Sequence, residues 1–124
     1  MTHESPVILF VDDEKSVLDG LRRCLWEQQD DWQMAFAIGA DQALTWMQTR
    51  QPDVVVTDMR MPGMNGDELL RRVQALYPAT ARLILSGHFD QEAEIRTSGL
   101  AHAYLLKPCP TETLIAAIRR VLGG

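Results

Sequence analysis

The chain has 124 residues, of which 46% are hydrophobic and 23% charged, and its formal net charge is −5. These values are ordinary for a globular domain that buries its own core. The acidic balance argues against direct binding to the phosphate backbone of nucleic acids, and no stretch approaches the roughly 20 apolar residues that span a bilayer.

Cysteine usage and the first residues of the chain indicate a cytoplasmic location. The two cysteines, Cys24 and Cys109, are far apart and form no CxxC pair, which is typical of a reduced protein. The start, MTHESPVILFVDDE, has neither the basic region nor the long apolar run of a secretory signal. Without repeats or low-complexity segments, the sequence predicts a single domain over residues 1–124, with its core at about 6–122.

Short apolar runs alternate with amphipathic segments, and this alternation predicts strands and helices in turn. In chain order we expect a strand at 7–11, a helix at 14–29, a strand at 32–38, a helix at 40–50, a strand at 54–57, a helix at 66–76, a strand at 82–85, a weak helix at 90–98, a strand at 103–106 and a helix at 111–122. Trp26 and Trp32, which flank a polar linker, are expected to cap the edge of the core.

Strand–helix units repeated along a chain are typical of an α/β fold, a doubly wound parallel sheet with helices on both faces. Such sheets bind ligands outside the carboxyl ends of their strands. The first strand is followed by Asp12 and Asp13, the third by Asp58, the fourth by Ser86 and the fifth by Lys107. We therefore expect these five side chains to meet at one edge of the sheet.

Three carboxylates at one edge repel one another, and a bound divalent cation would offset that repulsion. Oxygen ligands with no histidine or cysteine beside them favour Mg²⁺ over zinc. Lysine and a hydroxyl at the same edge suit a phosphoryl group, and an aspartate can itself be phosphorylated as a nucleophile. Each Asp considered alone would be read as a turn former or a helix N-cap, so the prediction depends on the whole set.

Four segments carry a resemblance to a known family. They are VDDE at 11–14, VVVTDMRMPGMNG at 54–66, LSG at 85–87 and YLLKP at 104–108. With them the chain resembles, over about residues 6–122, the receiver domain of bacterial two-component response regulators. The resemblance implies a flavodoxin-like five-stranded parallel sheet in the order 2-1-3-4-5.

The resemblance also implies roles for the acidic residues. Asp58 would be the phosphoacceptor and would ligate Mg²⁺ as well. Asp13 would be a direct metal ligand, and Asp12 would act largely through water. The backbone carbonyl of Arg60 would complete the protein ligands of the metal.

Three further residues would respond to the phosphoryl group. Ser86 would hydrogen-bond to it and Lys107 would pair with it. Tyr104 occupies the aromatic switch position of the family. Phosphorylation would then change the face formed by the fourth helix (90–98), the fifth strand and the last helix, as a shift between two states.

The partners implied by the resemblance are a sensor histidine kinase or a phosphotransfer protein as donor, and an output domain or effector on the switching face. A homodimer through that face is a further expectation, and neither nucleic acid nor a membrane is an expected direct partner. The domain would catalyse its own phosphorylation and dephosphorylation with no separate turnover substrate, so whether it counts as an enzyme is left open.

Two alternatives remain at this stage. One is a receiver-like interaction domain that is not phosphorylated. The other is an aspartate-nucleophile phosphatase similar to the haloacid dehalogenase type, which needs a second acid two residues after the nucleophile. That position holds Arg60. Arg60 and His88, which flank the site, are instead expected to influence how fast an aspartyl phosphate hydrolyses.

Overall fold

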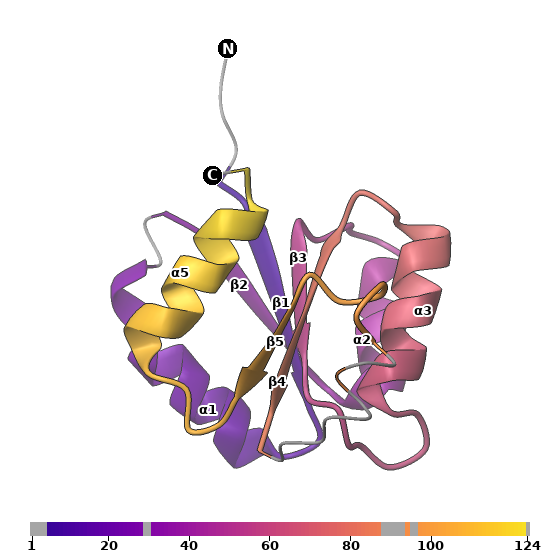
Figure 1. Cartoon of the computed structure of the whole chain (residues 1–124), viewed down its shortest axis with the longest axis horizontal. Helices are drawn as coiled ribbons and strands as arrows, with labels where there is room; N and C mark the ends of the chain where they lie inside the picture. The colour runs from indigo at the N-terminus through magenta and orange to yellow at the C-terminus, as the bar shows by residue number, and fades with distance from the viewer. Residues whose placement is uncertain (1–4, 29–30, 88–93, 95–96, 124) are drawn as a thin grey trace.

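The structure, a computed structural model of the chain, describes residues 5–28, 31–87, 94 and 97–123 (Figure 1). The strands are β1 (Val7–Asp12), β2 (Gln33–Ile38), β3 (Val54–Thr57), β4 (Ala81–Ser86) and β5 (Ala103–Leu106). The helices are α1 (Lys15–Cys24), the 3-10 helix η1 (Trp26–Gln28), α2 (Gly39–Met47), α3 (Gly66–Leu76) and α5 (Thr111–Val121). Most of the helix predicted at 90–98 lies outside the described residues.

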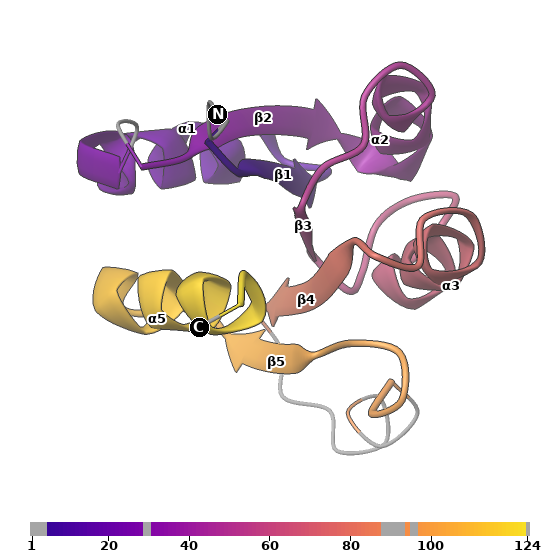
Figure 2. The same cartoon turned by 90° about the horizontal axis from the view of Figure 1, so that it is seen from above.

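The five strands form one parallel sheet in the order β2-β1-β3-β4-β5, which confirms the predicted doubly wound topology. Figure 2 shows α1 and α5 on one face of the sheet and α2 and α3 on the other, with β2 and β5 at the two edges. In the described part of the chain, no helix has the length and apolar character needed to cross a membrane.

The core consists of two layers, one on each face of the sheet. Side chains of β1 alternate between them: Leu9 and Val11 pack on the α2–α3 side, whereas Ile8 and Phe10 pack on the α1–α5 side. This explains why β1 is apolar throughout, since both of its faces are covered. The same burial fixes the end of the strand, and with it the direction in which Asp12 leaves the sheet.

Most predicted boundaries agree with the structure, and the clearest difference is the first helix. We predicted a helix over 14–29, but α1 ends at Cys24 and a separate 3-10 turn follows. After the fully buried Leu25, the next positions on the apolar stripe of the sequence are glutamines, so the amphipathic pattern that favours a helix ends there. The two tryptophans that we expected to cap the edge of the core differ from each other: Trp32 is buried, whereas Trp26 is 57% exposed.

Arg82 of β4 is a buried cation that the sequence did not single out. It is 7% exposed, and burial lowers the pKa of its guanidinium. Its Nε donates to the carbonyl oxygen of Leu100 at 2.6 Å, and its Nη1 donates to that of Thr80 at 3.0 Å. The side chain thereby fastens the chain before β5 to the start of β4.

Replacing Arg82 with methionine should cost about 2–3 kcal/mol of unfolding free energy, because two buried carbonyl groups would lose their donors. Urea unfolding followed by circular dichroism measures this. Arg71→Met is the matched control. That side chain is 53% exposed, and its ion pair with Asp67, 3.7 Å from Nη2 to Oδ2, is screened by water. Its loss should therefore change the free energy of unfolding by at most about 0.5 kcal/mol. Equal midpoints for both variants would contradict a structural role for Arg82.

Candidate functional site

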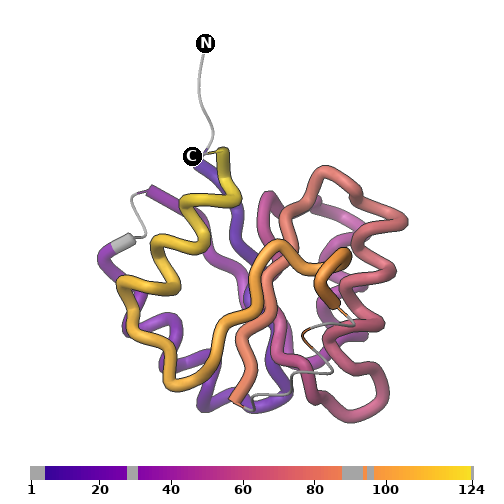
Figure 3. Tube along the Cα trace, viewed as in Figure 1, coloured from indigo at the N-terminus to yellow at the C-terminus, as the bar shows by residue number. Residues whose placement is uncertain are grey.

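The carboxyl ends of β1, β3, β4 and β5 reach the same end of the molecule, at the bottom of the trace in Figure 3. Asp12 is the last residue of β1, and Asp58 directly follows β3. Asp12, Asp13 and Asp58 each place a carboxylate oxygen within 4.8 Å of the other two. The structure therefore brings together the three acids that the strand pattern predicted to meet.

Lys107 joins this cluster from the end of β5. Its Nζ donates to Oδ2 of Asp12 at 2.9 Å and lies 4.0 Å from Oδ2 of Asp58. Its backbone N–H donates to the carbonyl oxygen of Ser86 at 2.8 Å, which ties the ends of β4 and β5 together. Ser86 itself is buried, and the pairing of Thr57 with Ile84 sets the end of β4 beside the end of β3.

The remaining contacts of the acids distinguish Asp12 from Asp58. Oδ1 of Asp12 accepts the backbone N–H of Glu14 at 3.0 Å, so both oxygens of Asp12 have donors. Oδ1 of Asp58 accepts the N–H of Met59 at 2.8 Å, and its Oδ2 faces Lys107 at the longer distance. The Asp58 side chain is 15% exposed and that of Asp12 is 4% exposed. Asp58 is thus the more accessible of these two carboxylates.

Burial raises the pKa of Asp58 above its ordinary value, and the charges of Asp12 and Asp13 raise it further. The ammonium group of Lys107 and the N–H of Met59 act in the opposite direction, but they do not cancel the effect. The ionised form of Asp58 is therefore less stable in the fold than in water. A cation at this position would relieve both the desolvation and the repulsion.

The segment 59–66 returns the chain from Asp58 to α3 over a short, fixed path. Met59 and Met61 are buried beneath the site, in the core layer on the α2–α3 side. Gly63 turns the chain with a φ of 82°, a value that favours glycine. The N–H of Gly66 donates to the carbonyl oxygen of Met59 at 2.7 Å, so α3 begins directly against the backbone that carries Asp58.

Gly66 is a determinant of the site that sequence reasoning missed. A Cβ atom at Gly66 would collide with the carbonyl oxygen of Asp58, and it would also lie 3.0 Å from the carbonyl carbon of Asp58 and 3.1 Å from Cα of Met59. Only a residue without a side chain fits there. The available signal was the last glycine of MPGMNG, placed where a helix begins, but a close approach of two backbones cannot be seen in one segment.

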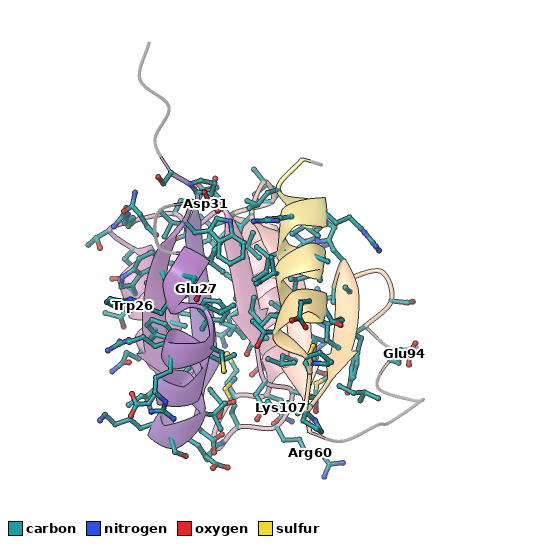
Figure 4. The ribbon with its side chains drawn as sticks, turned by 90° about the vertical axis from the view of Figure 1, so that its left-hand side faces the viewer. Trp26, Glu27, Asp31, Arg60, Glu94 and Lys107 are labelled. Carbon is teal, nitrogen blue, oxygen red and sulfur yellow. The ribbon has the colours of Figure 1, made fainter. Side chains whose placement is uncertain are left out.

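The other predicted residues lie around the cluster. Arg60 is exposed, and Figure 4 shows it at the same end of the molecule as Lys107 with its side chain directed away from the fold. Tyr104 is half-buried on β5, opposite Ile84, and packs on the core layer of the α2–α3 side. His88 lies outside the described residues.

The donor set fits Mg²⁺. All three side chains offer hard carboxylate oxygens at mutual distances that one small cation can bridge. Their combined negative charge is only partly offset by Lys107, the one ammonium group that the structure shows in contact with them. Among the described residues, no histidine or cysteine belongs to this group of possible ligands. The composition therefore favours Mg²⁺ over softer metals.

Comparison with known proteins agrees with this geometry. The family model of the response regulator receiver domain matches residues 8–119. The transcriptional regulatory protein YesN of Bacillus subtilis, described as uncharacterized, is 35% identical over 119 residues, which are 94% of this chain and 32% of that protein. The response regulator UvrY of Escherichia coli K12 is 31% identical over 94% of this chain and 54% of its own length. The chain thus spans about a third to a half of these relatives.

Solved structures show the same fold. The signal receiver domain of an HD domain-containing protein from Pseudomonas fluorescens Pf-5 superposes with a TM-score of 0.90 at 31% identity, covering 96% of this chain and 95% of that one. The chemotaxis protein CheY4 of Vibrio cholerae gives a TM-score of 0.85 at 28% identity, covering 95% and 99%. The fold, the acidic cluster with its lysine and the family match agree, and the chain belongs to the response regulator receiver domain family.

Proposed function

We propose that this domain accepts a phosphoryl group on Asp58 from the phosphohistidine of a sensor histidine kinase or a phosphotransfer protein, with Mg²⁺ as cofactor. Membership of the receiver family supports signalling by an aspartyl phosphate. The observation that favours Asp58 over Asp12 is the difference in their contacts: Asp12 has donors on both oxygens, whereas Asp58 keeps Oδ2 at 4.0 Å from the Lys107 ammonium.

In the transfer, a carboxylate oxygen of Asp58 attacks phosphorus. An O–P bond forms while the N–P bond of the donor breaks, and the histidine leaves with the bonding electron pair. Lys107 is placed to pair with an oxygen of the transferred group after a small shift away from Asp12, and the Ser86 hydroxyl would donate to another oxygen. Attack by water on the same phosphorus would later release phosphate and restore Asp58.

The proposed metal ligands are Asp13 and Asp58 directly, the backbone carbonyl of Arg60, and Asp12 through water. Bound there, Mg²⁺ would offset the charge that gathers as an anionic phosphoryl group approaches three carboxylates. The contribution of the chain is to hold the acids close together: Asp12 by its strand and by the Glu14 N–H, and Asp58 by the Met59 N–H.

We assign the switch to Ser86 and Tyr104. Ser86 ends β4 at the site, and Tyr104 is on β5, three residues before Lys107. A shift of Ser86 toward a phosphoryl group would give Tyr104 a different space to fill, because β4 and β5 pair side by side. Phosphorylation would thus favour one of two arrangements of the predicted switching face, of which the structure describes β5 and α5.

That face is the proposed contact for an output domain, an effector or a second receiver. The support is by analogy: matched relatives include transcriptional regulators, and one structural neighbour belongs to an HD domain-containing protein. The switching surface would transmit the signal to such a partner without direct contact between this domain and nucleic acid or a membrane. A cytoplasmic location belongs to the same proposal.

The function is tested by incubating the chain with Mg²⁺ and acetyl phosphate and measuring the intact mass. We expect the mass of one phosphoryl group to be added to the wild type and to Asp31→Asn, a control at the opposite end of the molecule (Figure 4), but not to Asp58→Asn. An unmodified wild type would favour the non-phosphorylated interaction domain. Steady turnover of an added phosphomonoester would favour the phosphatase.

Arg60 should slow the loss of the phosphoryl group. Its exposed side chain points away from the fold in this structure, but Arg60 is two residues after Asp58, and its guanidinium can turn over a phosphoryl group on Asp58, where it would obstruct the attacking water. We expect the aspartyl phosphate of Arg60→Ala to decay several-fold faster than that of the wild type, with Arg60→Lys in between, when loss of the added mass is followed over time. Equal or slower decay in Arg60→Ala would count against this role.

A further inference from the structure

β2 is an edge strand with an open side. The N–H of Gln33 donates to the carbonyl oxygen of Pro6 beside β1, at 2.8 Å. In a parallel ladder, alternate residues bond to the same neighbour, so the backbone groups of Met34, Phe36 and Ile38 point away from β1. Gln42 accepts the outward N–H of Ile38 at 2.6 Å. Within the described part of the chain, no residue accepts the outward N–H groups of Met34 and Phe36.

Apart from the Gln42 side chain, which covers the N–H of Ile38 and would have to release it, this edge lacks the features that usually prevent strands from pairing between chains. The sequence of β2 is QMAFAI, with no charge, proline or glycine in six residues. Exposed edge strands of this kind pair readily with another strand unless something covers them. Ile38 is 46% exposed at the end of the strand. The edge is thus ready to accept a partner strand.

Two hollows flank this edge on the α1 side. One, of about 380 Å³, lies at the start of β2 and is lined by Arg22, Trp26, Trp32, Gln33, Met34 and Phe36. The other, of about 200 Å³, lies toward the end of β2. Its apolar walls are Leu18, Phe36 and Ile38, and its polar walls are Lys15, Asp19, Arg22 and Gln42. Trp26 is 57% exposed, and Figure 4 shows it on the β2 side of the molecule, away from Glu94 beyond β5. A large apolar group therefore stands at one end of the edge, and a hollow with both apolar and charged walls lies at the other.

Charges along the edge change sign from one end to the other. On the α1 side, exposed Glu27 follows Trp26 at the start of β2, and exposed Lys15 lines the hollow at its end, where its Nζ lies 3.6 Å from Oδ2 of Asp19. On the α2 side, Nη2 of Arg50 donates to Oε1 of Gln33 at 2.6 Å, at the start of β2. Exposed Asp41 lies in the first turn of α2, just beyond the end of β2. The α2 side thus carries opposite charges at opposite ends, whereas the charge of Lys15 on the α1 side is already offset by Asp19.

We propose that β2 pairs antiparallel with β2 of a second copy of this chain, about a two-fold axis through the middle of the edge. This arrangement places Trp26 of each copy at the hollow beside Ile38 of the other. It also sets Arg50 opposite Asp41, a contact that occurs twice as an isologous interface requires. A parallel two-fold pairing would turn one copy over and set Arg50 beside Glu27 instead, so the partner of Arg50 distinguishes the two arrangements. Arg22, near the centre, keeps its guanidinium over the Phe36 ring at 4.6 Å.

The experiment is analytical ultracentrifugation of the unphosphorylated chain without Mg²⁺, over a wide range of concentration. We expect the average mass to rise toward that of two chains. Ile38→Lys should weaken the association at least about tenfold, which corresponds to 1.4 kcal/mol. Leu76→Lys and Leu106→Lys change residues that are 63% and 43% exposed on α3 and β5, and they should have no effect. A wild type that stays monomeric, or an effect of Leu106→Lys in place of Ile38→Lys, would overturn the proposal.

A charge exchange tests the antiparallel arrangement itself. Arg50→Glu and Asp41→Lys should each weaken the dimer because like charges would then face each other, and the double variant should recover most of the wild-type affinity. If the two losses add up in the double variant, the antiparallel pairing is wrong. Hydrogen exchange gives an independent readout, since the amides of Met34 and Phe36 should exchange more slowly as the concentration rises. Concentration-independent exchange at both amides would also overturn the proposal.

Discussion

Replacing Gly66 with alanine should destabilise the domain by about 3 kcal/mol or more and should also lower phosphorylation of Asp58. The added methyl group would collide with the carbonyl oxygen of Asp58, which is backbone and cannot rotate away. Relief requires α3 to move away from the segment after β3, and that movement breaks the 2.7 Å hydrogen bond from the Gly66 N–H to Met59. Urea unfolding measures the loss of stability, and intact mass after acetyl phosphate treatment measures the loss of modification.

Gly20→Ala is the matched control for this substitution. Gly20 lies within α1, where the nearest atom to an added Cβ would be the flexible end of Arg23 at 4.0 Å. Alanine is the better helix former, so this variant should gain up to about 1 kcal/mol. The same chemical change would therefore have opposite signs at the two positions. If Gly66→Ala unfolded at the wild-type denaturant concentration, α3 would not begin against Asp58 as the structure shows.

The contrast between Asp58 and Gly66 shows what the sequence could predict. Asp58 was predictable because its position depends on one rule: the apolar run at 54–57 must be a buried strand, and parallel strands deliver their next residue to a common edge. The meeting of Asp12, Asp13, Asp58 and Lys107 follows from that rule alone. The contact of Gly66 with Asp58 depends instead on the path of a loop, which no periodicity encodes.

Arg82 and β2 illustrate the same limit. Arg82 begins the strand predicted at 82–85, and nothing in that run marks it as buried, whereas the structure buries it with its side chain donating to the carbonyl groups of Leu100 and Thr80. The run QMAFAI is readable as a strand, but its place at the edge follows from the strand order, which local patterns leave open and the family resemblance implied. Residues that act through neighbours distant in the chain are those that sequence patterns alone do not reveal.

Asp58→Asn should change stability in opposite directions with and without Mg²⁺. Without metal, we expect the variant to be more stable than the wild type by about 1 kcal/mol, because it removes a buried carboxylate that two neighbouring carboxylates repel. Lys107 keeps its partner in the variant, since its 2.9 Å contact is with Asp12. With metal at ten times its Kd, the wild type should gain about 1.4 kcal/mol from binding. The variant lacks one ligand and should gain much less.

Urea unfolding at neutral pH, with a chelator or with Mg²⁺ at matched ionic strength, measures both effects, and Asp31→Asn should follow the wild type in each. The raised pKa of Asp58 gives the sign: above that pKa the ionised carboxylate costs native stability, and the cost disappears as the pH falls below the ordinary value of 3.8. The advantage of asparagine without metal should therefore vanish in acid. A variant less stable than the wild type at neutral pH without metal would contradict charge repulsion as the property that prepares this site for a cation.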